Sequence, residues 1–198
     1  MIDLHKGQSK VYYDLFVKKD HRFSVVRAAR GWGKSYFASS CGASAVMELL
    51  KLDASVPNKN VYIIAPTYDQ VTDIYWPILS YDFQLDSMAI KASRDVGRFI
   101  FPRNVELRLV SYEAIERLRG KGGYFTVLDE VSSWKNAMEA WESIIQPVIV
   151  TRWSEKNAKA YGANPGRSLT ISTPKGYNFF YDMHNFYEVD PSWKSYHF

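Results

Sequence analysis

The stretch RAARGWGKS, residues 27–35, joins a short apolar segment to a long segment with helical periodicity. Gly31 and Gly33 let the backbone wrap closely around an anion, and the N–H groups at a helix N-terminus attract phosphate. Lys34 is spaced to reach the β- and γ-phosphates of a nucleotide, and the Ser35 hydroxyl is a candidate ligand of Mg²⁺. The stretch therefore predicts a phosphate-binding loop between a strand and a helix.

This loop departs from the usual pattern G-x-x-x-x-G-K-[ST] at one position. Ala28 stands where the pattern has its first glycine, and two arginines, Arg27 and Arg30, lie in a loop that normally needs only its lysine. The outer position opens the turn, so a small side chain is acceptable there. By itself the stretch is compatible with a working nucleotide site, a degenerate site or a chance match.

A second motif favours the working site. Residues 125–130, FTVLDE, form an apolar segment that ends in two acids, 95 positions after Lys34. At the end of a neighbouring strand, Asp129 would hold Mg²⁺ through water, and Glu130 would act as the general base that polarises the attacking water. The alternative is that these two acids form a solvated strand exit or a helix cap. Together with Lys34 they predict ATP hydrolysis.

Two weaker features lie outside these motifs. Ser172 and Thr173 follow the apolar residues LTI (169–171) and precede a proline, so their hydroxyls could sense the γ-phosphate or the attacking water. Gln8 lies 26 residues before Lys34, and its amide matches the N6 and N7 edge of adenine. An ordinary turn and plain surface are the respective alternatives.

Composition limits the class of protein. The chain has 198 residues, 46% of them apolar, and a net charge of +4, which predicts a globular domain and suits a polyanionic partner. Cys41 is the single cysteine, so no internal disulfide can form. The N-terminus lacks an apolar signal core, and no apolar run is long enough to span a bilayer. We therefore expect a soluble intracellular protein without membrane contact.

Strand-like and helix-like periods alternate along the chain, which predicts an α/β fold with a mostly parallel sheet and helices on both faces. Strands are expected at Arg22–Arg27, Val61–Pro66, Arg98–Phe101, Val105–Val110, Tyr124–Glu130 and Ser168–Pro174. Helices are expected at Lys34–Leu50, Tyr68–Leu79, Glu113–Leu118, Ala137–Pro147 and Tyr177–His184. Residues 152–167 are polar and basic, and are expected to form a mobile loop, either simply solvated or in contact with nucleic acid.

Taken in order, these pieces resemble the ATPase domain of the large terminase subunit, the DNA-packaging motor of tailed bacteriophages. The resemblance rests on LHKGQ, RAARGWGKS, APTYDQ, LRGKGG, TVLDE and ISTPKG, which extend over nearly the whole chain. It implies a P-loop NTPase with a RecA-like (ASCE) core that uses ATP and Mg²⁺. It also implies a homo-oligomeric ring on the portal protein that moves double-stranded viral DNA into a procapsid in the host cytoplasm, with a small terminase subunit as a further partner.

The resemblance also assigns roles by position. Gln8 becomes the adenine reader, and residues 31–35 (Gly31, Trp32, Gly33, Lys34 and Ser35) become the Walker A loop. Ser35 and Asp129 hold the metal, Glu130 is the catalytic glutamate of Walker B, and Ser172 with Thr173 form the coupling motif. Arg30 corresponds to the loop arginine that senses or stabilises the γ-phosphate, and Arg119 to an arginine finger acting across the subunit interface, with a surface ion pair as the alternative.

Members of that family carry a C-terminal nuclease of the RNase H type, and residues 1–198 hold no matching acidic constellation. We therefore expect a single ATPase domain without DNA cleavage by this chain. Two alternatives stay open on the sequence alone. One is a helicase-like RecA-fold ATPase fragment, which would need a second such domain to close its site. The other is a nucleotide-binding assembly module that does not hydrolyse ATP.

Overall fold

The computed structural model describes residues 3–198 and contains one eight-stranded sheet. Its strand order is β3-β4-β5-β2-β6-β7-β1-β8. Six strands pair in parallel, and the β3–β4–β5 meander at one edge is antiparallel. The strands are β1 (Phe23–Arg27), β2 (Asn60–Ala65), β3 (Lys91–Ser93), β4 (Arg98–Phe101), β5 (Val105–Ser111), β6 (Phe125–Asp129), β7 (Arg167–Ser172) and β8 (Trp193–His197).

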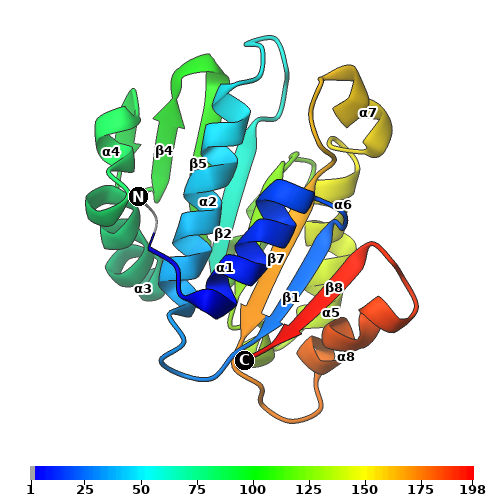
Figure 1. Ribbon diagram of the computed structural model, residues 1–198. Coiled ribbons are helices and arrows are strands. Elements are labelled where there is room, and N and C mark those ends of the chain that lie inside the picture. Colours follow the sequence, from blue (N-terminus) through cyan, green and yellow to red (C-terminus); the bar gives the residue numbers. More distant parts are fainter. Residues whose placement is uncertain (1–2) are drawn as a thin grey trace.

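Helices cover both faces of this sheet, as Figure 1 shows. One face carries α1 (Lys6–Tyr13), η1 (Asp14–Lys18), α2 (Lys34–Leu50), α3 (Tyr68–Gln70), η2 (Val71–Tyr75), η3 (Ile78–Asp82) and α4 (Leu85–Met88). The other carries η5 (Tyr112–Leu118), η6 (Val131–Ser133), α5 (Ala137–Ala140), η7 (Trp141–Ile145), α6 (Gln146–Val150), α8 (Phe179–Asn185) and η8 (Phe186–Glu188). The short turn η4 (Pro102–Asn104) joins β4 to β5.

The apolar runs of the central strands supply two separate cores. In β2, Val61 and Ile63 pack with α2 on one face, while Tyr62 and Ile64 pack with η7 and α6 on the other. A strand with both faces buried needs apolar residues at every position, which is why these segments are continuous rather than alternating. The sequence-based expectation of a mostly parallel sheet with helices on both faces is therefore confirmed.

The strand register brings three segments to one edge of the sheet. Arg27, the last residue of β1, pairs with Ser172 at the end of β7, and Ile171 in turn pairs with Asp129 at the end of β6. Because these strands are parallel and adjacent, the loops that leave their carboxyl ends lie side by side. Ligands of open α/β sheets bind at this edge.

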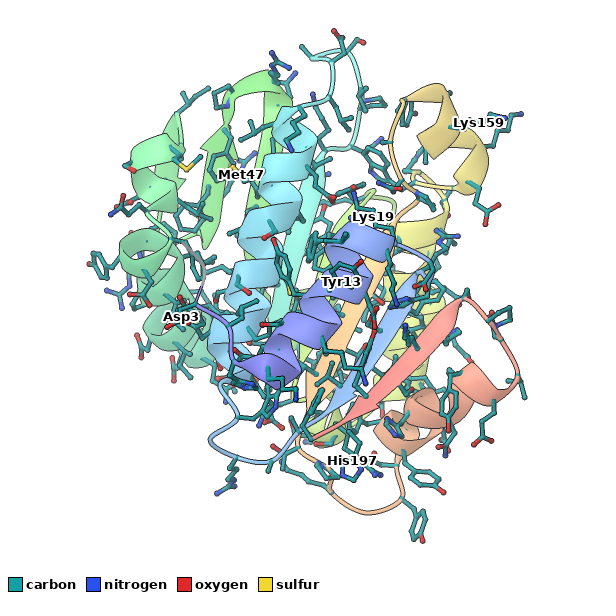
Figure 2. All side chains as sticks on the ribbon, viewed as in Figure 1. Asp3, Tyr13, Lys19, Met47, Lys159 and His197 are labelled. Carbon is teal, nitrogen blue, oxygen red and sulfur yellow. The ribbon has the colours of Figure 1, made fainter. Side chains whose placement is uncertain are left out.

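Several elements differ from the expected pattern. The sequence did not predict α1, β3 or β8, and residues 152–167 are not a continuous loop, because they contain α7 (Glu155–Ala160). The Ser154 hydroxyl caps α7 by accepting from the N–H of Asn157. Lys159 projects from α7 away from the sheet, as Figure 2 shows. No helix within residues 3–198 is long and apolar enough to cross a membrane.

A buried arginine, Arg167, links the N-terminal helices to the sheet. Arg167 is 1% exposed, forms an ion pair with Glu48 of α2, donates to the carbonyl of Leu15 and bonds the Tyr124 hydroxyl. Lys19 binds the same carboxylate. The network ties the N-terminal helices to α2 and β7.

We expect Arg167→Met to lower the free energy of unfolding by about 3 kcal/mol, because it leaves Glu48 and a buried carbonyl without their main donor. Urea denaturation followed by circular dichroism measures this change. Arg94→Met is the matched control: Arg94 pairs with Asp73 at the surface, so its loss is expected to cost less than about 1 kcal/mol. Equal effects of the two substitutions would contradict the role of the network.

Candidate functional site

The loop from Ala28 to Gly33 connects β1 to the N-terminus of α2. Gly31 and Gly33 both have φ of 82°, a backbone conformation that residues other than glycine rarely adopt. Ala28 has no positive φ, is fully buried, and donates its N–H to the carbonyl of Ser172. The first glycine of the usual pattern is therefore not needed here, and its replacement by alanine does not disturb the loop.

Residues of α1 brace this loop from outside. The Gln8 amide donates to the carbonyls of Trp32, at 3.1 Å, and Gly33, at 3.4 Å. Its oxygen accepts from the N–H of His5, whose ring lies 3.1 Å from the Trp32 carbonyl. The Trp32 ring stacks on Phe198 with centroids 5.2 Å apart. Gln8, expected to read adenine, therefore contacts the phosphate-binding loop itself. The contact from His5 was not predicted from the sequence.

Lys34 lies at the centre of the site. Its Nζ is 2.8 Å from the Thr173 hydroxyl, 3.2 Å from the Ala29 carbonyl and 3.6 Å from Glu130 Oε1. These partners come from β7, from the loop and from the end of β6, which are far apart in the sequence. A γ-phosphate that approached Lys34 would meet an ammonium group already held between a carboxylate and a hydroxyl.

The Glu130 carboxylate is fixed from several sides. It accepts from the Thr173 hydroxyl at 3.2 Å, from the Thr173 N–H at 3.4 Å and from the Ser172 hydroxyl at 3.3 Å. The backbone of Glu130 has φ of 49°, which is uncommon for a residue with a side chain and is found preferentially at functional sites. The side chain is 25% exposed, so water can reach it.

Asp129 is the buried partner in the pair of acids. It is 6% exposed, burial raises its pKa to about 6, and its Oδ1 has no hydrogen-bond partner. Ser35, in the first turn of α2, lies near Asp129, since its hydroxyl and the Asp129 carboxyl both face the hydroxyl of Tyr75. A buried carboxylate with one oxygen unpartnered and a hydroxyl nearby fits a divalent cation, which would compensate the unfavourable charge.

Mg²⁺ usually takes only one or two protein ligands and completes its shell with phosphate and water. Among residues 3–198, three or more His, Cys, Asp and Glu side chains gather nowhere as a metal cluster. Asp129 and Ser35 therefore fit the sparse ligand set that Mg²⁺ needs beside a nucleotide.

Comparison with known proteins identifies the family. No protein-family model matches the chain. The large terminase subunits of Thermus phage G20c and Thermus virus P23-45 are each 30% identical to it in an alignment 177 residues long, and the match covers 80% of this chain. The chain belongs to the large terminase subunit family. It spans about a third of the length of these curated relatives, since the match covers 32% of each.

Solved terminase structures share the fold. The ATPase domain of the Thermus phage P74-26 large terminase matches 98% of this chain and 80% of its own length with a TM-score of 0.69 and 23% identity. A mutant of the same domain matches 99% of this chain and 81% of its own length, with a TM-score of 0.72 and 24% identity. The HK97 bacteriophage large terminase matches 98% of this chain and 39% of its own length, with a TM-score of 0.61 and 15% identity. The expected RecA-like P-loop fold is confirmed.

The two arginines predicted as site residues of this terminase chain, Arg30 and Arg119, lie in different places. Arg30 is exposed in the phosphate-binding loop, three residues before Gly33. Arg119 lies in the segment that enters β6, at the opposite end of the strand from Asp129. Its side chain is 49% exposed, pairs with Glu116 and donates to the carbonyl of Ser143. Arg119 is therefore not among the side chains that surround Lys34 in its own subunit.

Ser132 is a site residue that the sequence did not reveal. Its hydroxyl bonds the Ser172 hydroxyl at 2.7 Å and the Thr173 carbonyl at 2.8 Å. Its N–H also donates to the Ser172 hydroxyl. Ser132 thus joins the turn after the two acids directly to the expected coupling residues, so a shift of one segment displaces the other.

Proposed function

We propose that this chain binds ATP with Mg²⁺ and hydrolyses it. The observation that carries the proposal is the meeting of Lys34, Glu130 and Thr173 from three separate segments at the carboxyl edge of the sheet. A lysine that forms an ion pair with a carboxylate, with both groups hydrogen-bonded to the same hydroxyl, is an arrangement suited to phosphoryl transfer to water.

In this proposal the residues have distinct tasks. The N–H groups of the loop through Gly31, Trp32 and Gly33 cradle the phosphates, and Lys34 neutralises charge on the γ-phosphate. Glu130 accepts a proton from the attacking water, and Thr173 and Ser172 hold its carboxylate in place. Arg30, exposed in the loop, closes on the γ-phosphate, and Gln8 holds the loop and reads adenine.

Ser35 and Asp129 would hold the metal. When bound, Mg²⁺ supplies positive charge at the β- and γ-phosphates, where negative charge develops during transfer. The Asp129 carboxylate is the protein group best suited to orient the metal's water shell.

Beyond ATP hydrolysis, we infer the role of a packaging motor. Subunits of this terminase would form a homo-oligomeric ring on the portal protein, with the small terminase subunit as a partner, and translocate double-stranded DNA into a procapsid in the host cytoplasm. The chain would act as a single ATPase domain and would not cut DNA. Membership of the large terminase family supports this role over a helicase fragment, and Glu130, a candidate general base beside Lys34, argues against an assembly module without turnover.

Lys34→Ala tests the nucleotide site. A hydrogen bond from a charged group contributes about 1.5–3 kcal/mol, so we expect ATP affinity to fall roughly 10- to 150-fold and hydrolysis to be lost. Calorimetry measures the affinity, and phosphate release measures turnover, both on wild type and variant at equal Mg²⁺. Lys51→Ala, at the exposed carboxyl end of the same helix, is the control and should change neither. Unchanged ATP affinity in Lys34→Ala would exclude the loop as the phosphate site.

A further inference from the structure

Tyr75 is a fully buried tyrosine whose hydroxyl has no hydrogen-bond partner. It is the last residue of η2, a single π-helical turn that packs against α2. A hydroxyl buried without a partner is unfavourable, and such groups in folded proteins usually have a function or meet an absent ligand. None of the motifs in the sequence includes Tyr75.

The surroundings of this hydroxyl indicate its function. It faces the carboxyl of Asp129 at the end of β6 and the hydroxyl of Ser35 in the first turn of α2. Asp129 Oδ1 is likewise buried and without a partner. Two side chains that face each other thus each carry a buried polar atom without a hydrogen-bond partner, and among residues 3–198 no basic side chain hydrogen-bonds either atom.

We propose that Tyr75 is a positioning residue for the metal site, whose hydroxyl orients Asp129 and Ser35 toward the bound cation. The role rests on the proposed function. Ser35 would help to hold the cation, and its hydroxyl would donate to Tyr75 Oη. The Tyr75 hydroxyl would in turn donate to the Asp129 carboxylate, which would hold the cation's water shell. No proton leaves its oxygen; the three groups only hold one another in place.

Such outer contacts have measurable consequences. Groups that hydrogen-bond a metal's ligands fix their orientation, and their loss typically lowers metal affinity by about 10- to 100-fold. Tyr75 touches no phosphate-binding atom of the loop in this arrangement. Its loss is therefore expected to act on the metal and to leave the metal-free nucleotide interaction unchanged.

Tyr75→Phe removes only the hydroxyl. ADP affinity is measured by calorimetry with Mg²⁺ and again with EDTA, and the ratio of the two dissociation constants gives the contribution of the metal. We expect this ratio to fall about tenfold in Tyr75→Phe, with the affinity in EDTA within about twofold of wild type. Tyr62→Phe is the matched control, because Tyr62 is 1% exposed and its hydroxyl bonds Gly122, remote from the site.

Thermal unfolding without nucleotide separates positioning from packing. Because the hydroxyl has no partner in the metal-free protein, Tyr75→Phe should unfold at the same temperature as wild type or at a higher one. A lower unfolding temperature, or failure to fold, would overturn the proposal, since it would show that the hydroxyl stabilises the metal-free fold. An unchanged affinity ratio in Tyr75→Phe would also overturn it. Absence of any Mg²⁺ effect in wild type would instead overturn the proposed function, and this role with it.

Discussion

Glu130→Gln is expected to keep ATP binding and to reduce hydrolysis by about 10²- to 10⁴-fold, the usual contribution of a general base. Glutamine has nearly the shape of glutamate, so its oxygen can still accept from the Ser172 hydroxyl and the Thr173 N–H, and its NH₂ group can donate to the Thr173 hydroxyl instead of accepting from it. An amide has no basic oxygen at neutral pH and cannot take a proton from water. The change therefore removes the chemistry while it leaves the pocket in place.

The effect of Glu130→Gln on binding has a definite sign. Glu130 Oε1 lies 3.6 Å from Lys34 Nζ and competes with an incoming γ-phosphate for its charge. Without the carboxylate, Lys34 is free for the nucleotide, so ATP affinity should be equal to that of wild type or higher. Binding by calorimetry and phosphate release by a coupled assay, measured on the same preparation, test both parts.

Glu139→Gln is the control for this prediction, since Glu139 is exposed on α5 and loses the same charge. It should change neither binding nor turnover. Hydrolysis by Glu130→Gln at the wild-type rate would show that another group activates the water. Loss of both binding and hydrolysis would mean that Glu130 supports the fold of the site rather than the chemistry.

The parts of the site that could be predicted are those set by local sequence. Apolar strands that end in acids or hydroxyls can be recognised one at a time, and parallel pairing then brings Asp129, Ser172 and Arg27 to the same edge. Gly31 and Gly33, just before Lys34, likewise indicate a phosphate-binding loop, because the positive φ that glycine permits depends only on these two residues and not on distant packing.

The parts that could not be predicted depend on packing between distant elements. In the sequence, nothing distinguishes Tyr75 from the other residues of the helix predicted at Tyr68–Leu79. Only the packing of η2 on α2 turns its hydroxyl toward Asp129. Ser132 looks like any turn serine until β6 and β7 are paired. In β8, residues 193–197 lack a regular pattern because an edge strand is only partly buried. Helix α7 has no apolar stripe, and a cap at Ser154 marks its start.

Arg119 poses a separate question, because it lies at the wrong end of β6 to reach its own nucleotide. The five residues of β6, at about 3.3 Å each, place roughly 16 Å of strand between that end and Asp129. Within the part of the chain that the structure describes, residues 3–198, its exposed guanidinium bonds Glu116 and the Ser143 carbonyl and no other group. An arginine in this position can assist hydrolysis only at the site of a neighbouring subunit.

We therefore expect Arg119→Ala to lower turnover about 10³- to 10⁵-fold in the proposed ring, the range found for arginine fingers, and to leave turnover of the isolated monomer unchanged. Phosphate release is measured at a concentration where the chain is monomeric and again under conditions where the proposed ring forms. Arg117→Ala, which removes an exposed arginine two positions earlier, is the control and should retain activity in both states. A loss in the monomer would place Arg119 at its own site and contradict the assignment.

Mixing two inactive variants provides the decisive test of action between subunits. Lys34→Ala subunits keep Arg119 but have no working nucleotide site, whereas Arg119→Ala subunits keep Lys34 and Glu130 but offer their neighbours no finger. In a mixed ring, some intact sites of the second variant lie next to an intact Arg119 of the first, so hydrolysis should reappear at those interfaces. A finger acting within its own subunit predicts no recovery at any mixing ratio. Recovery that peaks at intermediate ratios therefore requires that Arg119 serve the adjacent site.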